Sequence, residues 1–148
     1  MTTELETRLL ELARDAKITH ATDDLWLEAP ELDVTRMATV LQDLGARLST
    51  ITGIALDGGE TELIYHYVVG KTALNLKVRT RGNSMASITP LVPAANWTER
   101  EIHDLYAVEF PGHPNLERFI RPAELPAGLF REPGGAAGKR LREQAGKI

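Results

Sequence analysis

One short stretch of this 148-residue chain holds most of the side chains that could carry out chemistry. It groups carboxylates, imidazoles and guanidinium groups: Glu99, Arg100, Glu101, His103, Asp104, His113 and Arg118. Carboxylates and imidazoles one helical turn apart can bind a metal ion or transfer protons. Their spacing here matches neither the His-Glu-x-x-His of zinc proteases nor the Glu-x-x-His of di-iron bundles. A stand-alone metal-dependent enzyme is therefore kept as an alternative, with four candidate ligands: Glu99, His103, Asp104 and His113.

The rest of the sequence offers little for catalysis. His20 and His66 are isolated, and Ser49, Ser84 and Ser87 lack the context of a nucleophile elbow. No glycine-rich stretch stands between a strand and a helix, as phosphate binding requires. The absence of cysteine excludes disulfides, thiolate zinc sites and cysteine-ligated iron–sulfur clusters.

The charge balance argues against nucleic acid as a partner. The chain carries 17 basic and 21 acidic residues, with a net charge of −4, whereas phosphate backbones attract basic surfaces. Its apolar runs are shorter than the roughly 20 residues of a membrane-spanning helix, so we expect no direct membrane insertion. The acidic start, Met1–Glu6, lacks the order of a secretory signal, which favours the cytoplasm.

Two helices and two short strands are predicted before residue 45. Leucines and alanines at helical spacing predict a first amphipathic helix between Thr3 and Lys17. Two extended pieces follow within 18–29, separated by a polar turn. A second helix should begin after Asp33, which is a good N-cap, and end at Gly45.

After Gly45 the apolar period changes to two, which predicts three strands, Leu48–Leu56, Leu63–Val69 and Ala73–Thr80, in an antiparallel meander. In the last strand apolar and polar residues alternate, which indicates one face packed on helices and one face wet or covered by a partner. The fold class is therefore α+β, a two-layer sandwich of order α-β-β-α-β-β-β, then a further helix and an extended tail. We expect one domain over residues 1–120 and a Pro- and Gly-rich tail over 121–148.

The helix after Pro93 should position the ionisable cluster. Asn96 and Glu99 have the spacing of a capping box. A helical wheel places Glu101 on an apolar face formed by Trp97, Ile102, Leu105 and Tyr106. A carboxylate there needs a cation, and the chain offers four candidates: Arg79, Arg81, Arg118 and Arg121.

The opposite side of this helix pairs Glu99 with His103 and Arg100 with Asp104, four residues apart, which is typical of weak surface ion pairs. The helix is followed by the turn Phe110–Pro114, where Gly112 permits a positive φ and the prolines stiffen the backbone. We expect this turn to present His113 from a rigid loop and to place Phe110 in the core.

These two elements resemble a known family. Trp97–Glu101, Asp104–Tyr106 and the run Phe110-x-Gly112-His113-Pro114-x-Leu116-x-Arg118 are similar to the signature of the thirty-kilodalton, or C-type, subunit of respiratory complex I. The same module occurs in energy-converting NiFe hydrogenases. Three positions depart from its pattern: Ala107 where glycine is usual, Glu117 where a basic residue or proline is expected, and Phe119 in a usually aliphatic region.

The resemblance implies a structural subunit of the peripheral arm of a complex I-like membrane-bound oxidoreductase. Such a protein has no cofactor of its own, carries no catalytic residue and packs against the iron–sulfur subunits and the large catalytic subunit, which is of the NiFe hydrogenase type or D-type. It would reside at the cytoplasmic face of the cell membrane through the complex. The role of internal anchoring and of contact between subunits passes to the matching positions: Trp97, Glu99, Arg100, Glu101, Asp104, Phe110, Gly112, His113, Pro114 and Arg118. An unrelated binding module is the remaining alternative.

Overall fold

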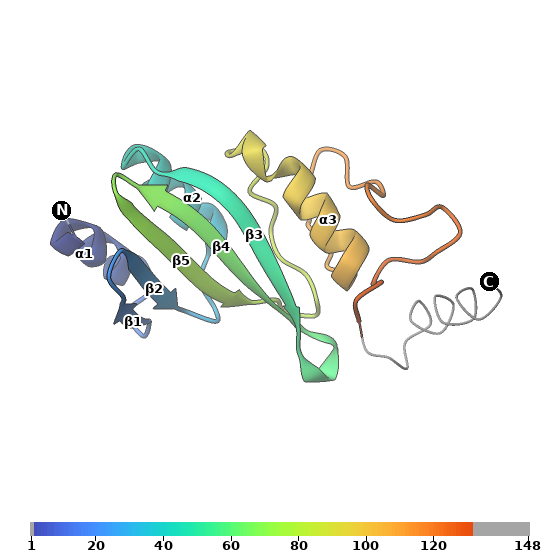
Figure 1. Cartoon of the computed structure of the whole chain (residues 1–148), viewed down its shortest axis with the longest axis horizontal. Helices are drawn as coiled ribbons and strands as arrows, with labels where there is room; N and C mark the ends of the chain where they lie inside the picture. The colour runs from blue at the N-terminus through green and yellow to red at the C-terminus, as the bar shows by residue number, and fades with distance from the viewer. Residues whose placement is uncertain (1, 132–148) are drawn as a thin grey trace.

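The computed structural model describes residues 2–131 and contains the predicted order of elements (Figure 1). The three helices and five strands are α1 Thr2–Leu12, β1 Lys17–His20, β2 Asp24–Glu28, α2 Val34–Asp43, β3 Arg47–Ala55, β4 Thr61–Val69, β5 Thr72–Arg79 and α3 Asn96–Tyr106. Helix α1 ends earlier than predicted, because Lys17 already pairs with Glu28 in the β1–β2 hairpin. Part of the predicted tail, 132–148, lies outside the described residues.

The five strands form one sheet in the order β1-β2-β5-β4-β3. The predicted meander is confirmed, since β3 pairs with β4 and β4 with β5, both antiparallel. The sheet is nevertheless mixed, because β2 lies parallel to β5 with Leu25 opposite Leu74 and Leu27 opposite Leu76. The sequence pattern did not reveal this parallel pairing between segments far apart in the chain.

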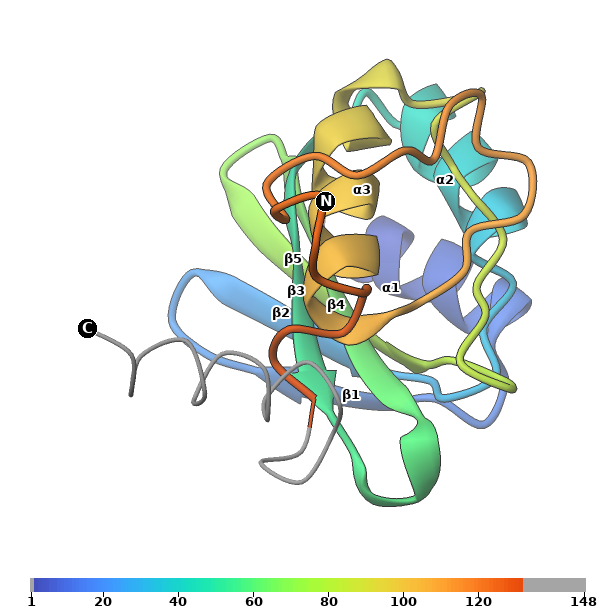
Figure 2. The same ribbon diagram turned by 90° about the vertical axis from the view of Figure 1, so that its right-hand side faces the viewer.

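The three helices cover one face of the sheet, so the molecule has two layers (Figure 2). Leu74, Leu76 and Val78 point from β5 into a single apolar core shared with α1, α2 and α3, as their alternation predicted. Helix α2 begins as expected, because the side chain of Asp33 accepts a hydrogen bond from the amide of Arg36 at 3.1 Å.

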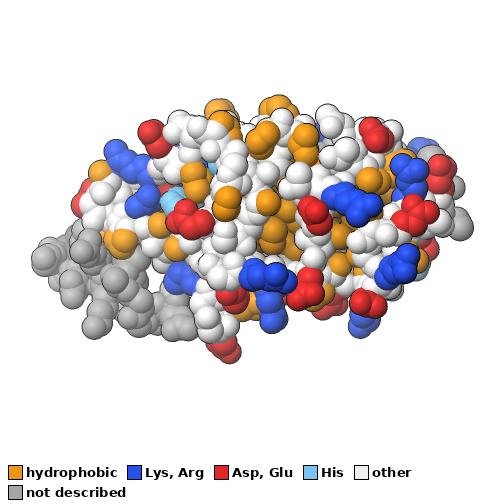
Figure 3. All heavy atoms as spheres, turned by 180° about the vertical axis from the view of Figure 1, so that it is seen from behind, with side chains coloured by type: hydrophobic (Ala, Val, Ile, Leu, Met, Phe, Trp, Pro, Cys, Tyr) orange, Lys and Arg blue, Asp and Glu red, His pale blue; other side chains and the backbone are white. Residues whose placement is uncertain are grey.

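The opposite face of the sheet carries polar side chains beside apolar ones such as Ile64. His66 bonds to Asn75 on β5 through Nδ1 at 2.7 Å and to the hydroxyl of Thr52 on β3 through Nε2 at 2.8 Å. On the helix-covered side of the molecule, which Figure 3 shows, basic and acidic side chains are interspersed with hydrophobic ones. Within residues 2–131 no helix has the length and apolar character needed to cross a bilayer.

Candidate functional site

The inner face of α3 packs closely against strand β3. Gly53 makes this approach possible, because a Cβ atom at that position would lie 2.7 Å from the ring of Tyr106 and 2.9 Å from Cδ1 of Ile102. Such distances are shorter than van der Waals contact, so any side chain at residue 53 would push the helix away from the sheet.

Glu99 also points inward from α3 and is fully buried. Its carboxylate accepts hydrogen bonds from the hydroxyl of Ser87 at 2.7 Å, the amide of Ile88 at 3.1 Å and the hydroxyl of Thr89. No lysine or arginine of residues 2–131 forms an ion pair with it. Glu99 therefore fastens the segment before α3 to the helix through uncharged donors, which satisfy a group that would be costly to bury alone.

The buried carboxylate of Glu99 contributes to raising the pKa values of two tyrosines of β4, Tyr65 and Tyr67. Burial, and then the nearby charge of Glu99, raise the pKa of Tyr67 to about 12. The same two causes, in the same order, raise the pKa of Tyr65 well above its ordinary value. The hydroxyl oxygen of Tyr65 is buried and has no hydrogen-bond partner in the described part of the chain.

Asp104 is the second fully buried carboxylate of α3. Its Oδ2 atom accepts hydrogen bonds from the backbone amides of Phe119 and Ile120, both at 2.7 Å, and from that of Arg121 at 3.1 Å. The Nε atom of Arg121 also donates to Oδ1 at 3.1 Å. Burial alone would raise the pKa of Asp104, but the three amides and the guanidinium group hold it below its ordinary value.

Residues 117–131, which we name the strap, return over α3 after the helix ends (Figure 2). The carbonyl oxygen of Asp104 accepts the amide of Gly128 at 2.7 Å, and that of Leu105 accepts the amide of Phe130 at 2.7 Å. Leu105 is buried but lies outside the core cluster that the helices share with the sheet. The strap therefore covers the outer face of the C-terminal half of α3.

The end of the strap is fastened to the β3–β4 hairpin. The guanidinium group of Arg131 donates to the hydroxyl of Thr61 at 2.8 Å, to the carbonyl of Glu60 at 3.1 Å and to that of Leu56 at 3.4 Å. These residues precede Arg131 by about half the chain, so the contact joins distant parts of the sequence.

Both predicted surface pairs are wrong, because their carboxylates are buried. The guanidinium group of Arg100 instead donates to the carbonyl oxygens of Glu117 at 3.0 Å and Arg118 at 2.9 Å. His103 donates from Nδ1 to the carbonyl of Val108 at 2.8 Å. Each side chain thus binds the backbone of the segment that follows the helix.

The predicted capping box is also wrong. The N-cap is Ala95, without a side-chain hydrogen bond, and Asn96 already lies in the helix. Helix α3 continues from the 3-10 turn Pro93–Ala95, so the first amide of α3 bonds to the carbonyl of Pro93. The carboxylate of Glu99 is therefore not used to cap the helix and bonds to Ser87 in the interior instead.

The prediction that Glu101 lies among apolar side chains is likewise wrong. Glu101 is exposed, and Trp97 is 66% exposed. The helical wheel combined two separate surfaces: Ile102 faces the sheet, whereas Leu105 is buried outside the core cluster, and its backbone carbonyl is bonded to the strap. The buried carboxylate that is neutralised by an arginine exists, but it is Asp104, paired with Arg121.

The turn after α3 has the expected geometry. Phe110 is buried in the core, and Gly112 has a φ of 91°. His113 donates from Nε2 to the carbonyl of Asn96 at 3.2 Å, which links the turn to the start of the helix. Pro114 is exposed.

The four candidate metal ligands do not converge. Glu99 faces the core, Asp104 faces the strap, and the two histidines bind backbone carbonyls at opposite ends of α3. Across residues 2–131 no group of three potential ligands is close enough to hold a metal ion. The arrangement supports an anchoring role for this helix within its own chain.

Sequence reasoning missed the partners that make these bonds. Ser87 and Thr89 lie just before Pro90, and their alternation with Ile88 could have indicated two hydroxyls on one side of an extended segment. The sequence predicts Arg121 only as one of four candidate partners of Glu101. Nothing local in the sequence indicates that residues 119–121 present three amides to one carboxylate.

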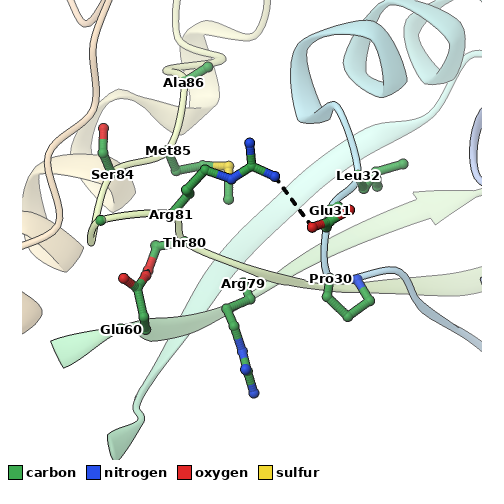
Figure 4. Close-up of a pocket in the computed structure, with 11 residues that line it drawn as sticks. Pro30, Glu31, Leu32, Glu60, Arg79, Thr80, Arg81, Ser84, Met85 and Ala86 are labelled. Atoms are coloured by element: carbon green, nitrogen blue, oxygen red, sulfur yellow. Dashed lines mark hydrogen bonds and ion pairs between the residues drawn. The ribbon is translucent and has the colours of Figure 1, made fainter. Parts of the chain in front are cut away.

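A cleft of about 490 Å³ opens where β5 ends (Figure 4). Arg81 reaches across it to Glu31 at 3.3 Å, and both side chains are well exposed. On its other wall Glu60 accepts the hydroxyl of Thr80 at 2.7 Å and the amide of Asn83, which lower the pKa of Glu60. Arg81 and Glu31 are the ion pair of the cleft, Glu60 is bonded to uncharged groups, and no signature residue between Trp97 and Arg118 lines it.

Comparison with known proteins identifies a family for most of the chain, including α3 and the turn that follows it. Residues 27–132 match the family described as respiratory-chain NADH dehydrogenase, 30 Kd subunit. The C-type subunit of NADH-quinone oxidoreductase from Mesorhizobium japonicum is 28% identical over 130 residues, which cover 81% of this chain and 63% of that protein. The combined C/D-type subunit from Bdellovibrio bacteriovorus is 29% identical over 111 residues, 70% of this chain and 20% of that protein. The chain thus spans less than two thirds of these relatives' own length.

A solved structure has the same fold. A chain of the membrane-bound sulfane sulfur reductase, an archaeal respiratory membrane complex, superposes with a TM-score of 0.77 and 22% identity, covering 99% of this chain and 92% of that chain. At this identity the likeness concerns the fold alone. Because the family match extends over most of the sequence and includes α3 with its following turn, the chain belongs to the family of the 30 kDa subunit of respiratory-chain NADH dehydrogenase.

Proposed function

We propose that this chain is a cofactor-free accessory subunit of a complex I-like membrane-bound oxidoreductase. In this role it docks against a large catalytic subunit, of the D-type or the NiFe hydrogenase type, beside the iron–sulfur subunits. It supports electron transfer coupled to ion translocation without carrying electrons itself. It would reside at the cytoplasmic face of the membrane through its partners.

The observation that carries this proposal is the use of the signature side chains inside the chain. Glu99 and Asp104 each fix a neighbouring segment, and Arg100 and His113 bind backbone carbonyls. Groups held in this way are poorly placed to act as acids, bases or ligands, because their lone pairs and protons are already committed. A scaffold role accounts for them better than catalysis does.

The choice of partner is supported by the relatives. In the proteins from Bdellovibrio bacteriovorus and Methylococcus capsulatus, the designation C/D joins the names of both subunits in one chain. Joining two modules covalently keeps them at high effective concentration, which favours their contact. A D-type subunit is therefore the first partner to test.

The test is purification of the tagged full-length chain from its native membranes, with identification of the proteins that accompany it. We expect a D-type large subunit and iron–sulfur subunits in comparable amounts. Recovery of the chain alone, or with unrelated proteins, would contradict the proposal and favour a separate binding module. A metal, flavin or cluster bound to the isolated chain at about one per chain would favour the metal-dependent enzyme instead.

A further inference from the structure

Three exposed hydrophobic side chains gather on the outer side of α3. Trp97 is 66% exposed, Phe119 41% and Ile120 50%. The rings of Trp97 and Phe119 stack with centroids 5.7 Å apart. We name these three residues the aromatic patch.

The aromatic patch is held rigidly by the bonds already described. The amides of Phe119 and Ile120 are fixed on the carboxylate of Asp104. The guanidinium group of Arg100 lies 5.1 Å from the centre of the Phe119 ring and bonds to the backbone just before it. Apolar side chains preorganised in this way lose little freedom on binding, which favours affinity.

We propose that the aromatic patch is the anchor by which this chain docks on its protein partner, an inference that rests on the proposed function. Tryptophan, other aromatic residues and arginine dominate the binding energy of protein interfaces. The matching partner surface has an apolar hollow for the two rings, and a carboxylate opposite Arg118. The side chain of Arg118 is exposed and has no partner among residues 2–131.

The charge around the aromatic patch favours a protein partner over a membrane surface. A whole aromatic side chain buries about 150–250 Å², so the exposed parts of the three side chains amount to roughly 300 Å². A specific protein interface buries about 800 Å² from each partner, so the patch is the centre of a larger contact and not the whole of it. The exposed carboxylates of Glu101 and Glu117 flank it and would repel anionic lipid headgroups.

The experiment measures binding of the full-length chain to the tagged D-type large subunit of its source organism. We expect Trp97→Ala and Phe119→Ala each to weaken binding about tenfold or more, and Arg118→Glu to weaken it more than Arg118→Lys. Ile120→Ser provides a further variant should one of the aromatic variants not fold. Thermal unfolding midpoints near that of the wild type would show that the fold is kept.

Phe130→Ala is the matched control. Phe130 is 61% exposed and packs edge-on against Tyr106 at the other end of α3, so its loss should change binding less than twofold. Equal binding by all variants would overturn the inference and leave the proposed function intact. Failure of the wild type to bind a large catalytic subunit of either the D-type or the NiFe hydrogenase type would instead overturn the proposed function, and with it the inference.

Two other occupants give results that also overturn the inference. A wild-type dimer in solution that Trp97→Ala dissociates would identify a second copy as the occupant. Binding to vesicles with anionic lipids that is lost in Trp97→Ala, with unchanged affinity for the D-type subunit, would identify a membrane surface.

Discussion

Glu99 and Asp104 lie on the same helix and are equally hidden from solvent, but they bind different parts of the chain. Glu99 accepts two hydroxyls and one amide from the segment that precedes α3. Asp104 accepts three amides and one guanidinium from the strap that follows it. One carboxylate secures the core side of the helix, and the other secures its outer covering.

The difference indicates how one helix can serve both stability and recognition. The segment bonded to Glu99 is largely buried, with Ile88 in the core. The segment bonded to Asp104 exposes Phe119 and Ile120 to solvent. Loss of Glu99 should therefore weaken the whole fold, whereas loss of Asp104 should release the strap first.

The largest effect is expected for Glu99→Ala, which should lower the free energy of unfolding by about 3–5 kcal/mol, because it leaves buried donors without an acceptor and opens a cavity. Denaturation by urea measures this change. Glu101→Ala, two residues further on the exposed side, is the control and should stay within about 0.5 kcal/mol. Equal effects of the two substitutions on the free energy of unfolding would show that the hydrogen bonds of Glu99 do not stabilise the fold.

Asp104→Asn should cost about 2–3 kcal/mol, because Arg121 is left without its counter-charge and the amides lose a charged acceptor. Hydrogen exchange should increase in the strap more than in residues 87–89. The exposed Glu109→Gln is the control and should change neither region. A uniform loss of protection would show that the strap is not a separate unit.

Acid should destabilise the fold in part by protonating the carboxylate of Asp104. The folded state lowers the pKa of Asp104 below its ordinary value of 3.8, so the unfolded chain takes up the proton first as the pH falls. Its contribution to stability is complete above pH 3.8 and is lost as the pH falls through the folded pKa. The free energy of unfolding of Asp104→Asn should depend less steeply on pH there than that of the wild type, and parallel curves would contradict this.

Gly53→Ala tests how closely the inner face of α3 must pack against β3. The added methyl would contact Tyr106 and Ile102 at less than 3 Å, which should cost about 1–3 kcal/mol through overpacking. Ser49→Ala, at an exposed position of the same strand, is the control for the change in strand propensity. An effect no larger than the control's would mean that α3 can move away from β3 freely.

The smallest expected effect is an increase in the free energy of unfolding. Ala107 ends α3 with a φ of 58°, a left-handed conformation in which glycine is not strained. Ala107→Gly should therefore stabilise the fold by about 0.5–1 kcal/mol in thermal or urea unfolding. Asn83 also has a positive φ, but its side chain donates to the carbonyls of Tyr106 and Ala107, so Asn83→Gly should destabilise.

Local periodicity predicted much of the fold. The alternation in β5 correctly identified its buried face, and Asp33 and Gly45 correctly predicted the bounds of α2, because these signals are local. Helix α3 is covered on two sides, by the sheet and by the strap, and a single apolar face cannot describe it. The error at Glu101 followed from this.

The sequence predicted the family of the chain but not the bonds that its signature side chains make. The spacing of Glu99, Asp104 and His113 identified the family, and that identification is confirmed. The partners of Glu99 and Asp104 lie 10 to 17 residues away in the sequence, for example Thr89 and Arg121, in segments without regular structure. No periodic pattern fixes where such segments cross a helix.

The three bonds that Arg131 makes to the β3–β4 hairpin have a mechanical consequence. Tension applied to the chain after residue 131 would load the hairpin before it reached the nest of amides around Asp104. The stacked rings of Trp97 and Phe119 would therefore keep their positions when the chain is pulled from that end.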